Sequence, residues 1–122
     1  MKRIIILLFI FVFSLGIANA ETSTEDLQEI YSQAELLMVQ GDYAGAAALY
    51  EQLSVYSDAA QMTLYCKAVY AADMGFYAVA VDALNSLGQF KDAPQLARYY
   101  TACSYLEYAE SNVEDNLVQF DL

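Results

Sequence analysis

Histidine and tryptophan are both missing from the 122-residue sequence, and the lack of histidine excludes much common catalytic chemistry. Without imidazole, neither a Ser-His nor a Cys-His nucleophile can form, and zinc loses a frequent ligand. The sequence has no glycine-rich phosphate loop and no run of alternating oxygen ligands of the calcium type. Its acidic residues are scattered on helical faces, where solvated charge explains them better than paired acid and base catalysis. We expect no enzymatic activity, no metal and no cofactor.

Basic residues are scarce, and two of the five stand at the start of the chain. They precede an apolar run at 4–17, and Ala18-Asn19-Ala20 follows that run. A positive end, an apolar core and small residues in this order are typical of a secretory signal peptide. The sequence therefore predicts a signal peptide at 1–20, cleaved after Ala20, and a protein that is secreted or extracytoplasmic, in the periplasm or outside the cell.

Removal of the signal would leave three basic residues against 16 acidic ones, a net charge of −13. A chain this acidic repels nucleic acid and anionic membrane surfaces, and it attracts basic partners. The high charge coexists with 11 Tyr and 6 Phe, a composition that folds rather than stays disordered. The remaining 102 residues favour one domain.

An internal repeat with a period of 34 residues is the strongest pattern in the sequence. Identical residues coincide without a gap at Tyr31, Tyr65 and Tyr99, at Ala34, Ala68 and Ala102, at Gly41 and Gly75, and at Asp58 and Asp92. Each period holds two stretches of helical apolar spacing. Gly41 and Gly75 separate the stretches, since glycine takes the left-handed conformation that ends a helix. Asp58 and Asp92 are expected to cap the helices that follow.

A 34-residue helical hairpin with Gly-x-Tyr-x-x-Ala in its second half resembles the tetratricopeptide repeat (TPR), in a divergent form like that of exported bacterial proteins. The resemblance implies an all-α fold, a short solenoid of about two and a half TPR-like helical hairpins. The third repeat is incomplete and has Ala109 where the others have glycine. The expected segments are an acidic N-terminal segment at 21–26, repeats at 27–60, 61–94 and 95–111, and a short capping helix or a frayed tail at 112–122.

The resemblance to TPR arrays implies a concave groove lined by the first helix of each repeat. Carried over position by position, this gives the groove candidates Tyr31, Glu35, Met38, Met62, Tyr65, Val69, Tyr99, Tyr100, Cys103 and Leu106. A ladder of tyrosines suits a bound helix or extended segment, although packing within the repeat is the competing interpretation. The cations with which the family clamps a C-terminal carboxylate are missing, so the expected partner is a basic or amphipathic protein segment.

Cys66 and Cys103 raise the possibility of a disulfide, because an exported chain meets an oxidising compartment. They fall on the first helices of neighbouring repeats, and adjacent helix axes lie about 8 to 10 Å apart, which is wide for a bridge. We interpret both as small buried hydrophobic residues and keep the disulfide as the alternative.

These features together predict an exported protein–protein interaction module, an adaptor or an assembly scaffold, that binds its partner in the groove. A structural subunit that is stable mainly as an oligomer is the first alternative, because about two and a half repeats lie near the lower limit for such arrays. A secreted enzyme that uses carboxylates alone is the second.

Overall fold

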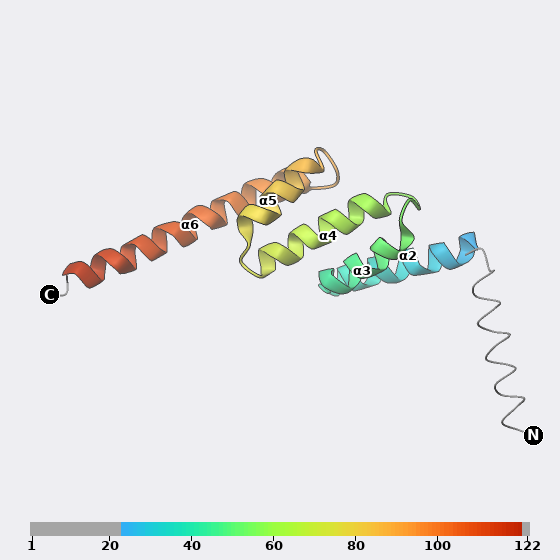
Figure 1. Ribbon diagram of the computed structural model, residues 1–122, viewed down its shortest axis with the longest axis horizontal. Helices are drawn as coiled ribbons and strands as arrows, with labels where there is room; N and C mark the ends of the chain where they lie inside the picture. Colours follow the sequence, from blue (N-terminus) through green and yellow to red (C-terminus); the bar gives the residue numbers. More distant parts are fainter. Residues whose placement is uncertain (1–22, 121–122) are drawn as a thin grey trace, which may run out of the picture.

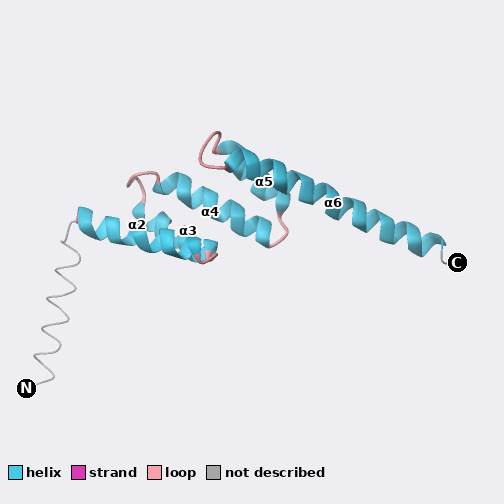
Figure 2. Cartoon of the chain, turned by 180° about the vertical axis from the view of Figure 1, so that it is seen from behind, coloured by secondary structure: helices cyan, strands magenta, loops and turns pink. Residues whose placement is uncertain are grey.

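The structure is a computed structural model that describes residues 23–120, so the expected signal peptide at 1–20 lies outside the described residues. The described part is all-helical, with the elements α2 (Thr24–Val39), α3 (Tyr43–Leu53), α4 (Ala59–Asp73), α5 (Tyr77–Ser86) and α6 (Ala93–Phe120). Each helix packs against its neighbours along the chain (Figure 1). Figure 2 shows the connecting loops at alternating ends of the helices. The predicted all-α fold is confirmed, and the packing is compatible with a short helical solenoid.

The first described helix starts ahead of the expected repeat boundary at residue 27. A capping box fixes the start of α2: the Ser23 Oγ accepts from the Asp26 N–H, and the Asp26 carboxylate accepts from the Ser23 N–H, both at 3.2 Å. This reciprocal pair satisfies two amides that have no partner within the helix. Part of the acidic segment at 21–26 is thus the first turn of α2 and not a separate segment.

The 34-residue period is visible in the helix boundaries and in the turns. Helices α3 and α5 begin 34 residues apart, as do α4 and α6. Gly41 and Gly75 end the first helices with φ of 84° and 85°, the left-handed conformation predicted for them. Positive φ recurs at the same offset in the following turns, at Ser54 and Gly88 and at Ser57 and Lys91. The sequence repeat is therefore also a repeat of backbone geometry.

Small residues form the points where the helices of the core approach one another. Ala46 on α3 and Ala80 on α5 have no exposed surface, as their mid-helix positions in the repeat predicted. Larger buried side chains, Tyr50 and Leu84, follow them on the same two helices. No charged side chain is buried within the described range. The core is thus a continuous apolar seam along the hairpins.

The aspartates before α4 and α6 have a different role from the one expected. The Asp58 side chain makes no cap hydrogen bond to α4. Its Oδ1 instead accepts a hydrogen bond of 2.6 Å from the Tyr31 hydroxyl. One period later, the Asp92 Oδ1 accepts from the Tyr65 hydroxyl, also at 2.6 Å. The prediction of a helix cap is wrong for Asp58, because a short charge-assisted bond fixes its carboxylate to the preceding hairpin.

The last helix continues without a break from Ala93 to Phe120. Glycine ends the first helix in the other two repeats, whereas Ala109 stands at the corresponding place. Alanine is the best helix former and does not favour the left-handed conformation, so the helix goes on. The separate capping helix expected at 112–122 does not form in the described residues. The second half of α6 instead projects beyond α5 (Figure 1).

Candidate functional site

Four of the predicted groove residues lie in the core. Met62 is 1% exposed, Val69 6%, and Tyr65 and Tyr100 8% each. A partner has no access to side chains this deeply buried, so this part of the predicted groove is wrong. The reason is that α4 packs on both α3 and α5, and α6 packs on α5, so the neighbouring helices cover these positions.

Two members of the tyrosine ladder hold the hairpins together. The Tyr31 ring meets Tyr50 edge to face, with 5.2 Å between centroids, and its hydroxyl is bonded to Asp58. Tyr65 donates in the same way to Asp92. Burial, and then the hydrogen bond to a carboxylate, raise the pKa of Tyr31 and of Tyr65. Packing, the competing interpretation, accounts for both residues.

The remaining groove candidates are spread over the molecule. Glu35 is exposed on α2, and Met38 is half-buried with its sulfur 3.9 Å from the Cys66 thiol. Tyr99 and Leu106, both on α6, are 63% and 64% exposed. These candidates do not form one groove. The two large apolar candidates that are exposed, Tyr99 and Leu106, both lie on α6.

Both cysteines have free thiols, so the disulfide is not formed. Cys66 is buried on α4, and Cys103 is half-buried on α6. Burial raises the pKa of the Cys66 thiol to about 11, and nearby Lys91 opposes this only in part. A thiol with such a pKa is unreactive, which fits the predicted packing role of Cys66.

Helix α6 carries a stripe of apolar residues that no other described element covers. Exposed side chains recur at helical spacing at Tyr99, Ala102, Leu106, Ala109 and Val113. At 3.6 residues per turn, these five positions lie within about a quarter to a third of the helix circumference. We refer to them as the bare face of α6. It extends from the part that packs on α5 into the projecting part of the helix.

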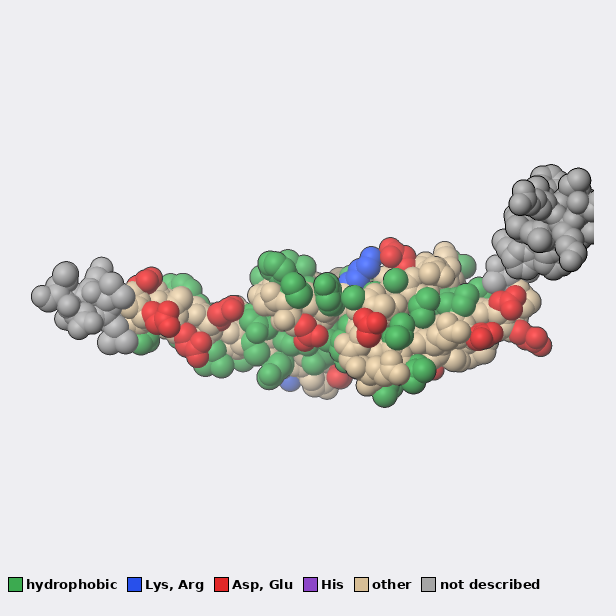
Figure 3. All heavy atoms as spheres, turned by 90° about the horizontal axis from the view of Figure 1, so that it is seen from below, with side chains coloured by type: hydrophobic (Ala, Val, Ile, Leu, Met, Phe, Trp, Pro, Cys, Tyr) green, Lys and Arg blue, Asp and Glu red, His purple; other side chains and the backbone are tan. Residues whose placement is uncertain are grey.

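Acidic side chains border the bare face. A shallow depression of about 370 Å³ is lined by Leu106, Ala109 and Val113 together with Glu110 and Glu114. Figure 3 shows hydrophobic and acidic side chains side by side along the projecting helix. No Lys or Arg follows Arg98 in the sequence. This combination of apolar surface and negative border is complementary to a segment with apolar and basic residues. The sequence predicted Tyr99 and Leu106 as contact residues, but not Ala109 and Val113, because the helix was expected to end near residue 111.

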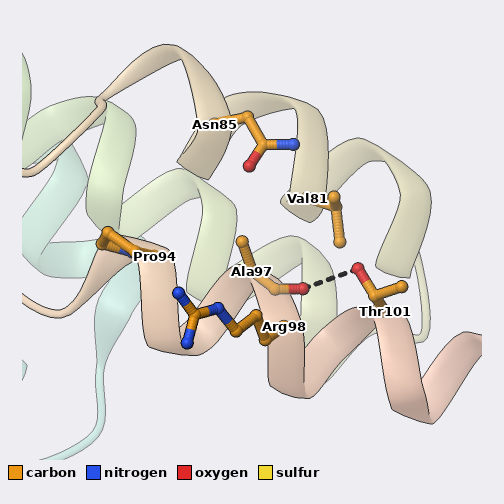
Figure 4. A pocket seen from close by; sticks show the side chains of 6 residues that line it. All are labelled: Val81, Asn85, Pro94, Ala97, Arg98 and Thr101. Carbon is orange, nitrogen blue, oxygen red and sulfur yellow. Dashed lines mark hydrogen bonds between the residues drawn. The ribbon is translucent and has the colours of Figure 1, made fainter.

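A second depression, of about 430 Å³, lies between α5 and α6 (Figure 4) and is lined by Val81, Asn85, Pro94, Ala97, Arg98 and Thr101. The Thr101 hydroxyl donates to the Ala97 carbonyl at 2.7 Å, so it is already bonded to the preceding turn of α6. None of the lining side chains is a carboxylate or a thiol that could act with Arg98. We assign no chemistry to this depression. Across residues 23–120, no cluster of three or more acidic or cysteine side chains could hold a metal ion.

No protein-family model, no curated protein and no solved structure compared with the chain matches it. Among the helices α2 to α6, none is both long and apolar enough to cross a membrane. The case for a function therefore depends on the repeat and on the exposed surface of α6.

Proposed function

We propose that this protein is an exported interaction module of the tetratricopeptide type, an adaptor or assembly scaffold that binds a basic or amphipathic segment of another protein. The observation that carries the proposal is the bare face of α6, an apolar stripe with an acidic border. Tyr99 supplies an exposed aromatic ring of the kind that anchors many interfaces, and Leu106 adds apolar contact area beside it.

The proposal moves the binding surface from the concave groove to α6. Met62, Tyr65 and Val69 support the fold from within, so they are not contact residues. The sequence pattern of the signal peptide supports export, and the net charge of −13 after its removal favours basic partners.

A structural subunit that assembles with copies of itself is the second candidate, and the same bare face favours it. Exposed contiguous apolar surface often marks a place of association. The acidic border argues against it, because two copies of α6 would bring Glu110 and Glu114 close to their own like charges.

A binding measurement with a purified partner tests the proposed function. Partners are recovered on the immobilised full chain from the envelope fraction of the native organism, purified, and titrated against the protein by calorimetry. We expect the Kd to rise as salt is added, because salt screens the acidic border. We expect Leu106→Glu to weaken binding by about tenfold or more, since it places a charge on the apolar stripe. A full chain that binds no purified candidate, or binding that neither salt nor Leu106→Glu affects, contradicts the proposal.

A further inference from the structure

The internal repeat allows each position of α6 to be compared with its counterpart on α4. The corresponding pairs are Tyr65 and Tyr99, Ala68 and Ala102, and Ala72 and Leu106. The three residues on α4 are 8%, 1% and 4% exposed. On α6, Tyr99 and Leu106 are 63% and 64% exposed, and Ala102 is exposed as well. The same repeat positions are thus core on one helix and surface on the next.

Helix α2 identifies what covers these positions in a complete hairpin. The main packing partner of α2 within the described residues is α3, the second helix of its own hairpin. Ala34 is the one residue of α2 that is fully buried, so α3 is what covers it. Ala68 and Ala102 are its counterparts at successive offsets of 34. The bare face of α6 is therefore the face on which the second helix of a hairpin packs.

We propose that the bare face of α6 binds a helix of a partner protein, which occupies on α6 the place that α3 occupies on α2 and α5 on α4. This inference depends on the proposed function and names the form of the partner segment. The partner helix lies antiparallel to α6, and it carries small and apolar residues on one face with Lys or Arg beside them.

The dimensions of the bare face fit such a helix. From Tyr99 to Val113 the face spans about 21 Å at a rise of 1.5 Å per residue. Helices α3 and α5 have 11 and 10 residues, and each is thus about 15 to 17 Å long. The small side chain of Ala102 allows a helix backbone to come close, as Ala34 does for α3.

Charge selects a basic partner helix over a second copy of this chain. Glu107, Glu110 and Glu114 lie along one edge of the bare face, and nothing basic follows Arg98. An antiparallel pair of α6 helices would place these carboxylates near their own copies, and like charges facing each other across an interface weaken association. Lysine side chains at the facing edge of a partner helix would instead be attracted to these carboxylates.

The test uses the purified full chain and a synthetic helical peptide as the probe. The peptide keeps the apolar face of α5 at the positions of Tyr77, Ala80, Val81 and Leu84, and it has lysine at the solvent-facing positions. A second peptide has glutamate at those positions. We expect fluorescence anisotropy to detect binding of the lysine peptide, with the glutamate peptide weaker by about tenfold or more. Failure of the lysine peptide to bind overturns the inference.

Two variants separate helix docking from other forms of binding. Ala102→Phe fills the point of closest approach, so we expect about tenfold weaker binding of the lysine peptide. Ser111→Phe adds the same side chain on the other side of α6 and should change the Kd by less than about twofold. If the Ala102→Phe variant binds the lysine peptide like the parent while the Leu106→Glu variant does not, the bare face binds an extended segment and not a packed helix. The inference then fails, and the proposed function stands. If light scattering finds a dimer that Leu106→Glu dissociates, a second copy is the occupant and the inference is wrong.

Discussion

Helices α4 and α6 are the first helices of neighbouring repeats, yet one is a core element and the other largely a surface. Their sequences agree at Tyr65 and Tyr99 and at the alanines that follow, so local pattern does not distinguish them. The difference arises at the end of the helix, where α4 stops before Gly75 and α6 continues through Ala109. A chain that turns back covers its own helix, and a helix that continues leaves that face open. Whether this face of a first helix is buried therefore depends on whether a turn follows the helix, and not on the residues of the face itself.

The largest expected effect comes from comparing a buried leucine on α5, the helix that packs on α4, with an exposed leucine on α6. Leu84→Ala should lower the free energy of unfolding by about 2 to 5 kcal/mol, because Leu84 is fully buried and its removal leaves a cavity. Leu106→Ala should change it by less than about 0.5 kcal/mol, since the side chain is mostly exposed. Urea denaturation of both variants measures the difference. Equal losses would mean that the bare face is covered in the free protein.

A substitution at the turn tests what ends α4. Gly75 has φ of 85°, and a Cβ there would meet no atom within 4 Å, so strain in the backbone is the whole cost of a side chain. We expect Gly75→Val to destabilise by about 1 to 2 kcal/mol in thermal denaturation. Glu51→Gln is the control: Glu51 pairs with Lys67 at 3.1 Å, but both are mostly exposed, so little should change. Similar melting of the two variants would show that the turn is misplaced.

Removal of a single tyrosine hydroxyl should affect stability differently on α4 and on α6. Tyr65→Phe removes the hydrogen bond to Asp92 and should cost about 1 kcal/mol. Tyr99→Phe should have almost no effect on stability, because Tyr99 is exposed. The buried hydroxyl of Tyr50 has no hydrogen-bond partner among the described residues, so Tyr50→Phe should be neutral or stabilising. Chemical denaturation of the three variants gives the order. If Tyr99→Phe lowers the free energy of unfolding as much as Tyr65→Phe does, Tyr99 is not the exposed counterpart of a buried tyrosine.

The smallest expected effect is a change in the unfolding free energy as the pH rises into the alkaline range. Burial raises the pKa of Tyr31, Tyr50 and Tyr65 above the ordinary value of 10.0, and that of Cys66 from 9.0 to about 11. The folded state holds these protons more tightly, so their stabilising contribution is complete below the ordinary values and is lost as pH rises through the raised ones. Unfolding free energy should therefore fall slightly between about pH 8 and about pH 10, and further above that. Circular dichroism during denaturation checks this, and a rise in stability over the same range would contradict it.

The sequence predicted the backbone of the repeat better than the roles of its side chains. The left-handed conformation at Gly41 and Gly75 followed from the physics of helix ends. The partner of Asp58 did not, because an aspartate before a helix can cap it or accept from another element, and Tyr31 lies 27 residues away. Competition between a local and a distant donor cannot be weighed from spacing alone.

The candidate surface was predictable only in part. The resemblance to the tetratricopeptide repeat selected one face of the first helices, and this face included Tyr99 and Leu106. It also included Met62 and Val69, since the position of a residue in the repeat does not say whether another helix of the chain covers it. The alanine at position 109 distinguishes the third repeat from the other two, but the helix was still expected to end near residue 111.

Hydrogen exchange on the purified full chain, with and without the lysine peptide, measures whether α4 is core and α6 is an open binding surface. In the free protein we expect slow exchange across α4 and fast exchange in the projecting part of α6, at residues 105–116, because few tertiary contacts hold that part closed. With the peptide, protection should rise at 99–116 and stay unchanged in α2. Equal protection of α4 and the projecting part of α6 in the free protein would mean that α6 is not an open surface, and peptide-induced protection in α2 instead of α6 would mean that the bare face is not the binding site.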